Sequence, residues 1–91
     1  MAEPLGTYRL TSHALRGIQR RGIQMAEVRQ VLSSPQQRYT VRPGRDVLQR
    51  KTAQSGKVYL LRVFVDVDRH PAEVVTAYKT SKIAKYRRSE S

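Results

Sequence analysis

The hydrophobic positions in the first third of the chain recur at helical spacing. They predict a first helix from about residue 12 to residue 21. Ser12 is expected to cap its amino end through its hydroxyl, and Gly22 can adopt the left-handed conformation that ends a helix. A second helix is predicted over 25–32, and Pro35 prevents it from extending much further. The apolar stripes consist of Ala14, Leu15 and Ile18 in the first helix and of Met25, Val28, Val31 and Leu32 in the second.

After Pro35 the period of the pattern changes to two, which is typical of strands. The run 58–65 is rich in β-branched and aromatic residues and almost continuously apolar, so it should be a central strand. A short final helix is expected from Ser81 to about Arg88, with Thr80 or Ser81 as its cap. The four predicted strands cover residues 38–42, 46–51, 58–65 and 73–79.

The predicted order of elements is ααββββα, which belongs to the α+β class. Short connections favour a four-stranded antiparallel sheet with the two N-terminal helices packed as a hairpin on one face. A chain of 91 residues can bury one modest core. We therefore expect a single domain over residues 1–91, with an ordered core at about 8–86 and a polar tail at 87–91.

Composition excludes several classes of protein. The chain has no cysteine, which excludes disulfide scaffolds, thiolate nucleophiles and zinc–thiolate sites. With two histidines it does not favour a multi-histidine metal site, and no cofactor is expected. No apolar run reaches the roughly 18–20 residues of a membrane span, and the first six residues lack the features of a signal peptide. The cytoplasm is therefore the expected location.

Charge indicates the class of partner. Eighteen Lys or Arg against seven Asp or Glu give a formal net charge of +11. Four arginines without an acid occur between Arg9 and Arg21, and five cations without an acid occur between Lys79 and Arg88. Clustered positive charge creates a local field that attracts an anionic partner, and nucleic acid is the usual candidate.

Three blocks of sequence resemble the RelE/ParE-like toxin superfamily, and more specifically an uncharacterised toxin-like family near the BrnT-type ribonucleases. One block is Ser12-His13-Ala14-Leu15 with Arg21-Gly22-Ile23, Glu27-Val28 and Val31-Leu32. Another is Gly56-Lys57 with Tyr59-Leu60-Leu61-Arg62-Val63, and the last runs from Val75 to Lys82. The chain differs from the toxin-like family that it resembles at Gly17, where members of that family often have an arginine. Arg16 and Arg20 flank this position.

The resemblance implies a toxin-like domain that acts on RNA. Toxins of this superfamily have the fold order given above, and an acidic antitoxin protein would cover the basic groove. The RNA would be mRNA, either free or bound to the ribosome. ParE-like relatives act on DNA gyrase, so the resemblance leaves RNA, gyrase and other proteins open as targets.

The candidate site residues combine this resemblance with the chemistry of RNA cleavage. Such cleavage needs a base for the 2′-hydroxyl, an acid for the 5′-oxygen and cations around the phosphorus. Histidine is the side chain whose ordinary pKa suits proton transfer near neutrality, and we expect His13 to lie beside the start of the last helix. The candidate catalytic residues are His13, Lys79, Lys82 and Tyr86. The candidate phosphate-binding residues are Arg16, Arg20, Arg21, Arg62, Thr80, Ser81, Lys85 and Arg87.

Structural roles are open for several of these residues. His13 can support the helix cap or pack under Arg16. Arg21 can pair with Glu27 or bind the carbonyl groups that end the first helix. Arg62 can point to a concave face or pair with an acid such as Glu73.

Three functions remain open at this point. The first is a metal-independent endoribonuclease of a toxin–antitoxin type system. The second is a non-catalytic module that binds RNA or the ribosome, and the third is a protein-interaction domain that docks an acidic partner.

Overall fold

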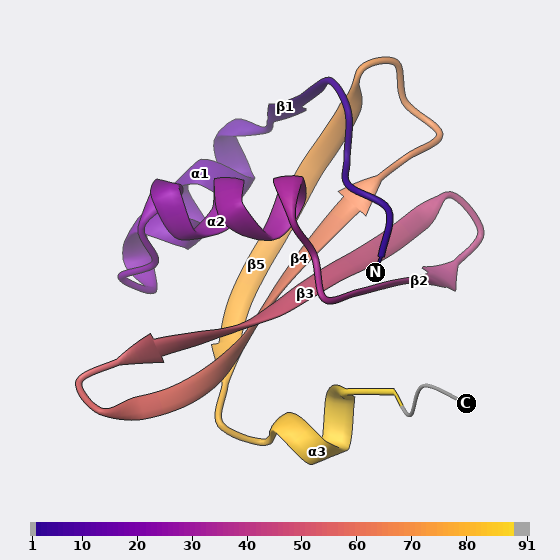
Figure 1. The fold of residues 1–91 in the computed structure, drawn as a ribbon. Coiled ribbons are helices and arrows are strands. Elements are labelled where there is room, and N and C mark those ends of the chain that lie inside the picture. The colour runs from indigo at the N-terminus through magenta and orange to yellow at the C-terminus, as the bar shows by residue number, and fades with distance from the viewer. Residues whose placement is uncertain (1, 89–91) are drawn as a thin grey trace.

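The computed structural model describes residues 2–88. A short strand opens the fold, two helices follow, and four longer strands and a single-turn helix complete it (Figure 1). The elements are β1 (Tyr8–Leu10), α1 (Ser12–Arg20), α2 (Met25–Ser33), β2 (Gln37–Arg42), β3 (Arg45–Gln54), β4 (Lys57–Asp66), β5 (Ala72–Thr80) and α3 (Ile83–Tyr86).

The sheet is five-stranded and mixed, in the order β1-β5-β4-β3-β2. β1 pairs with β5 in parallel, from Tyr8 opposite Ala72 to Leu10 opposite Val74, and the other pairs are antiparallel. The predicted four-stranded antiparallel sheet with two leading helices is therefore wrong. A strand of three residues is too short to show a period of two, and its pairing depends on a partner more than sixty residues away.

The ends of the helices also differ from prediction. Thr11, not Ser12, caps α1, because its hydroxyl oxygen accepts a hydrogen bond from the Ala14 amide at 3.0 Å. The final helix is a single turn preceded by Lys82, so the prediction of a helix over 81–88 is too long. The Thr80 hydroxyl accepts a hydrogen bond from the Lys82 amide at 3.1 Å and so stabilises the turn that leads into α3.

The core lies between the helices and one face of the sheet. Ala14 and Ile18 of α1 and Val28 of α2 pack against alternate residues of β4. We call this the helix-covered face, and its β4 residues are Leu61, Val63 and Val65. The intervening β4 residues, Leu60, Arg62 and Phe64, lie on the opposite face, because successive side chains of a strand alternate between faces. No helix within residues 2–88 combines the length and apolar character that a membrane span requires.

Candidate nucleic-acid interface

The register of the sheet places four polar side chains in one row on the face opposite α1 and α2. Gln37 of β2 lies opposite Gln49 of β3, and Gln49 lies opposite Arg62 of β4. Arg62 in turn lies opposite Tyr78 of β5. We call this row Gln37–Gln49–Arg62–Tyr78 the polar row. Arg62 is only 6% exposed and Gln49 is fully buried, so the row contains a charged group almost without access to water.

Hydrogen bonds connect the polar row into one network. Nε of Arg62 donates to Oε1 of Gln49 at 2.9 Å. Its terminal nitrogens donate to the hydroxyl oxygens of Tyr78 at 2.7 Å and Tyr39 at 3.0 Å. The Gln49 amide nitrogen donates to Oε1 of Gln37 at 2.8 Å. Each buried polar side-chain atom in residues 2–88 has a partner, as a stable buried network requires.

The guanidinium of Arg62 is stabilised without a carboxylate. The ion pairs found in residues 2–88 are Arg9–Glu73, Arg38–Asp46, Arg45–Asp66 and Lys79–Glu27. Glu73 pairs with Arg9, so the hypothesis that Glu73 neutralises Arg62 is wrong. Aromatic ring faces surround the Arg62 guanidinium instead, because the negative electrostatic potential of a ring face attracts a cation. The distances from Arg62 Cζ to the ring centroids are 4.5 Å for Tyr86, 5.2 Å for Phe64 and 5.7 Å for Tyr78.

Residues Tyr86 to Arg88 cover the polar row. The Tyr86 carbonyl oxygen accepts hydrogen bonds from the Tyr39 hydroxyl and from the Gln49 amide, both at 3.1 Å. The Arg88 amide donates to Oε1 of Gln37 at 3.0 Å, and the Gln37 amide donates to the Arg88 carbonyl. α3 contains no buried residue. This segment is therefore held by polar contacts, by cation–π contacts and by the packing of the Tyr86 ring against the Tyr78 ring.

The strands separate charge along their length. The β2–β3 and β4–β5 turns lie at one end of the sheet, and the β3–β4 turn and the start of α3 lie at the other. We call the second end the basic end and define it by four exposed lysines. They are Lys51, Lys57, Lys82 and Lys85. We call the first end the acidic end, because the acids Asp46, Asp66, Asp68 and Glu73 lie there.

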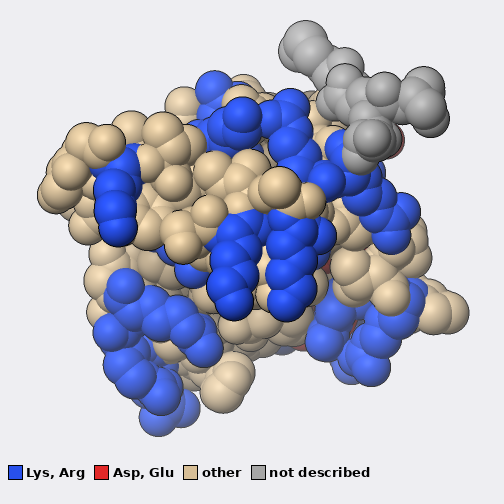
Figure 2. All heavy atoms as spheres, turned by 90° about the horizontal axis from the view of Figure 1, so that it is seen from below, with Lys and Arg blue, Asp and Glu red and all other residues tan. Residues whose placement is uncertain are grey.

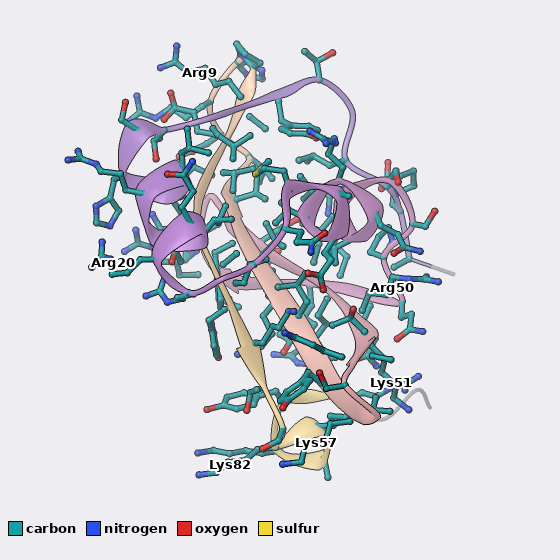
Figure 3. The ribbon with its side chains drawn as sticks, turned by 90° about the vertical axis from the view of Figure 1, so that its left-hand side faces the viewer. Arg9, Arg20, Arg50, Lys51, Lys57 and Lys82 are labelled. Carbon is teal, nitrogen blue, oxygen red and sulfur yellow. The ribbon has the colours of Figure 1, made fainter. Side chains whose placement is uncertain are left out.

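Ion pairs neutralise much of the positive charge at the acidic end. Arg45 donates to both carboxylate oxygens of Asp66, at 2.7 and 3.2 Å. These hydrogen bonds hold the pKa of the Asp66 carboxyl below its usual value, against the opposite effect of burial. Figure 2 shows the molecule from the side of α3, where Lys and Arg cover much of the surface and acids are barely visible. Lys57 and Lys82 lie together beside α3, far from Arg9 (Figure 3).

Lys79 lies close to the basic end but on the helix-covered face. Its ammonium nitrogen is 2.9 Å from Oε2 of Glu27 in α2 and donates to Oε1 of Gln54 at 2.8 Å. Burial alone would raise the pKa of the Glu27 carboxyl. Hydrogen bonds from Lys79, the Gln24 amide and Thr52, together with the Lys79 charge, outweigh burial and place this pKa below its usual value. Lys79 therefore joins a strand to a helix.

The other predicted residues on α1 do not meet the polar row. His13, Arg16 and Arg20 are exposed on α1, which packs on the helix-covered face, whereas Tyr86 packs on the opposite face. The structure therefore does not bring His13 together with Tyr86. Lys82 and Ser81 are exposed near the start of α3, and Lys85 lies over the Tyr86 ring at 5.3 Å.

Arg21 has a structural contact. Its guanidinium donates to the Ala77 carbonyl oxygen at 3.3 Å, so the hypothesis of an Arg21–Glu27 pair is wrong. Gly17 allows this contact, because a Cβ at this position would lie 2.9 Å from Nη1 of Arg21. The absence of an arginine at position 17 thus leaves room for the side chain of Arg21.

Several residues of these contacts were not predicted from the sequence. Of these residues, Gln49 has the clearest signal in the sequence. It directly follows Val47 and Leu48 in a strand, and a glutamine at the end of such an apolar run can be buried. Tyr39 and Gln37 gave no comparable signal, because their roles depend on the pairing of β2 with β3. The sequence indicated Arg21 as the partner of Glu27, whereas in the structure Glu27 pairs with Lys79.

Among residues 2–88 no group of three or more His, Asp or Glu side chains is arranged to hold a metal ion.

Comparison with known proteins gives one match. No curated protein and no solved structure matches the chain significantly. A family model described as "Domain of unknown function (DUF4258)" matches residues 10–79, from the end of β1 almost to the end of β5. Because this match covers most of the chain, the protein belongs to the DUF4258 family.

Proposed function

We propose that this domain binds RNA through the basic end. The observation that carries the proposal is the separation of charge along the sheet. Four of the six acids in residues 2–88, three of them paired with an arginine, lie at one end, and four exposed lysines lie at the other. Lysines that make no ion pair within residues 2–88 retain their full charge for phosphates, and the release of counterions from RNA then drives binding.

The partner is RNA in the cytoplasm, either free or as mRNA on the ribosome. The resemblance to toxins of toxin–antitoxin systems supports this choice, and it also supports an acidic antitoxin protein that would compete for the same lysines. Lys82 and Lys85 are the central phosphate-binding residues in this proposal. The hydroxyl of Ser81 and the side chain of Arg87 flank them.

The first test compares two variants that each lose two positive charges. In K82Q/K85Q both lysines of the basic end around α3 are neutralised, and in R42Q/R69Q two exposed arginines of the acidic end are neutralised. We expect K82Q/K85Q to bind a single-stranded RNA about tenfold more weakly at physiological salt, from two exposed contacts of about 0.7 kcal/mol each. R42Q/R69Q should bind almost as tightly as the wild type.

The salt dependence of binding gives an independent readout. The slope of log K against log salt should become less steep by about 0.7 for each phosphate group that the variant no longer binds. Equal weakening in both variants would show that only the total charge matters and would contradict the proposed interface. Negligible RNA binding by the wild type at physiological salt would favour docking of an acidic protein instead.

RNA cleavage is a second candidate function. The observation that favours it is the guanidinium of Arg62, which carries an un-neutralised charge 4.5 Å from the Tyr86 ring centroid. If residues 87 and 88 moved aside while Tyr86 stayed beside Arg62, the guanidinium would stabilise charge on a phosphate that the adjacent 2′-hydroxyl attacks. Tyr86 would donate its proton to the leaving 5′-oxygen, the proton of the attacking 2′-hydroxyl would pass to water, and the products would be a 2′,3′-cyclic phosphate and a 5′-hydroxyl.

Tyr86→Phe tests this chemistry with little disturbance of the fold. The hydrogen bonds described for Tyr86 run through its backbone carbonyl, and its ring stacks on Arg62, so phenylalanine retains both contacts. We expect Y86F to bind RNA normally and to cleave it at least about 10²-fold more slowly, as loss of a general acid requires. Tyr59→Phe, on β4, is the matched control. Mapping of RNA ends after induced expression measures cleavage, and unchanged cleavage in Y86F would exclude Tyr86 as the acid.

A further inference from the structure

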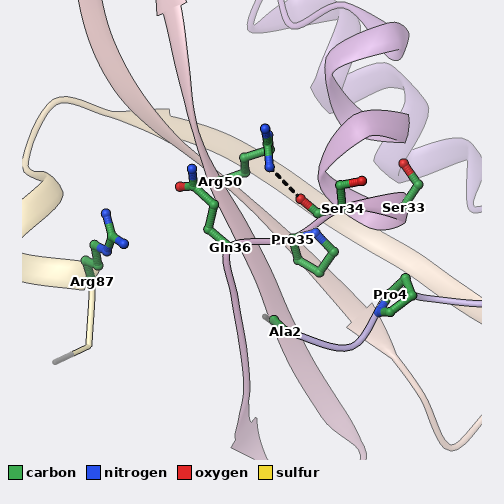
Figure 4. A pocket seen from close by; sticks show the side chains of 8 residues that line it. All are labelled: Ala2, Pro4, Ser33, Ser34, Pro35, Gln36, Arg50 and Arg87. Atoms are coloured by element: carbon green, nitrogen blue, oxygen red, sulfur yellow. Dashed lines mark hydrogen bonds between the residues drawn. The ribbon is translucent and has the colours of Figure 1, made fainter. Parts of the chain in front are cut away.

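We propose that a pocket at the edge of the sheet binds the phosphate and base of a nucleotide. The pocket has a volume of about 440 Å³, which falls within the range of small-molecule sites. It lies between the N-terminal segment, the end of α2, the start of β2, β3 and the residue that follows α3 (Figure 4). It shares Arg87 with the segment that covers the polar row, but none of the four lysines of the basic end lines it.

Two guanidinium groups give the pocket its charge. Arg50 comes from β3 and Arg87 follows α3, and no carboxylate side chain of residues 2–88 lines the pocket. Neither arginine takes part in an ion pair found in residues 2–88. Arginine suits phosphate because its planar fork can donate two parallel hydrogen bonds to two oxygens.

The orientation of Arg50 is set by the end of α2. Its Nη1 donates to the Ser34 carbonyl oxygen at 2.9 Å. The free carbonyl groups at the carboxyl end of a helix would repel an anion. Arg50 offsets this repulsion at Ser34 and still has other N–H groups to donate to a phosphate oxygen.

The remaining walls favour a nucleotide over a bare phosphate ion. Of the two prolines that line the pocket, the exposed Pro4 offers an apolar surface for a base, and the pocket is far larger than a single phosphate. The side chains of Ser33 and Gln36 also line it and can form hydrogen bonds to a sugar or a base edge. The ligand chemistry is therefore a nucleotide monophosphate, either free or at the end of an RNA chain. The inference that the pocket binds the end of an RNA chain rests on the proposed function, whereas the inference that it binds a free nucleotide does not.

Binding of adenosine monophosphate tests the pocket. We expect adenosine monophosphate to bind the full chain more tightly than adenosine or inorganic phosphate, as measured by titration calorimetry. Arg87→Gln removes one charged donor and should weaken this binding about tenfold or more. Arg50→Gln should weaken it similarly, and Arg42→Gln, at the far end of the sheet, should leave it unchanged. Equal affinity for adenosine, absence of binding at millimolar concentration, or equal weakening in R42Q would overturn the proposal.

Competition separates the two sources of the nucleotide. An RNA oligomer with a terminal phosphate should displace adenosine monophosphate better than the same oligomer with hydroxyl ends if the pocket holds an RNA end. Failure of both oligomers to displace adenosine monophosphate would identify a free nucleotide as the ligand. K82Q/K85Q should bind adenosine monophosphate normally. If RNA binding depends on Lys82 and Lys85 but adenosine monophosphate does not bind, the pocket proposal fails and the proposed function stands.

Discussion

Replacing Arg62 with alanine is expected to lower the free energy of unfolding by about 3–5 kcal/mol. Two costs combine in this variant. The truncation leaves a cavity among three aromatic rings, and it removes the donor to Oε1 of the fully buried Gln49. A buried polar atom without a partner costs about 1–3 kcal/mol. Urea denaturation followed by circular dichroism measures the change.

Arg62→Met separates the charge from the volume. Methionine fills most of the space and removes a buried charge that no carboxylate neutralises, so it should cost less than alanine. It still leaves Gln49 without its donor, and we expect a loss of about 1–3 kcal/mol. Replacing Gln49 with leucine as well should make the two substitutions non-additive, because the two residues share one network. A loss below about 1 kcal/mol in R62A would show that the network contributes little to stability.

Replacing Lys79 with methionine is expected to cost about 1–2 kcal/mol of stability. The ion pair with Glu27 is partly shielded, since the Lys79 side chain is 14% exposed and that of Glu27 is 23% exposed. Loss of one partner leaves a half-buried carboxylate without its cation, at a cost between those of exposed and buried pairs. Arg20→Gln, which removes an exposed cation of α1, should change stability by less than about 0.5 kcal/mol.

The pH dependence of stability tests the Lys79–Glu27 ion pair. The pKa of Glu27 is lower in the folded protein than its ordinary value of 4.5. The contribution of Glu27 to the free energy of unfolding is therefore complete above pH 4.5, and it is lost as the pH falls through the lower pKa of the folded state. K79M should lose stability less steeply on acidification than the wild type, because Glu27 no longer has its cation. An identical acid dependence in both proteins would contradict this role.

The same variant separates a structural from a catalytic role for Lys79. If the lysine only joins β5 to α2, K79M should bind and process RNA normally at temperatures where it remains folded. Loss of cleavage in a fully folded K79M would instead support the catalytic role that the sequence suggested.

Local patterns predicted the longer elements well. Both helices and the four longer strands occur within a few residues of their predicted bounds, since each has enough residues to show its period. The left-handed conformation of Gly22, at φ 67°, also follows from its position after a helical run. β1 and the short α3 were mispredicted, because three or four residues carry no clear periodicity and their conformation depends on distant partners.

The candidate site was less predictable than the fold. Lys79 and Lys82 are three residues apart, yet Lys79 pairs with Glu27 beneath α2 while Lys82 is exposed beside α3. Their separation depends on the face that each residue of β5 presents and on the turn that follows it. A cluster of positive charge in the sequence therefore did not show which cations remain free.

The sequence by itself determined the charge of +11, the absence of thiol chemistry and the positions of the long helices and strands. These properties depend on composition or on contacts between near neighbours. Only the tertiary structure decided that Arg62 is buried with no carboxylate partner in residues 2–88 and that Arg50 and Arg87 line one pocket. It also decided that the free lysines gather at one end of the sheet. Such arrangements depend on strand register and on pairing across tens of residues, so they cannot be deduced from the local pattern of apolar and polar residues.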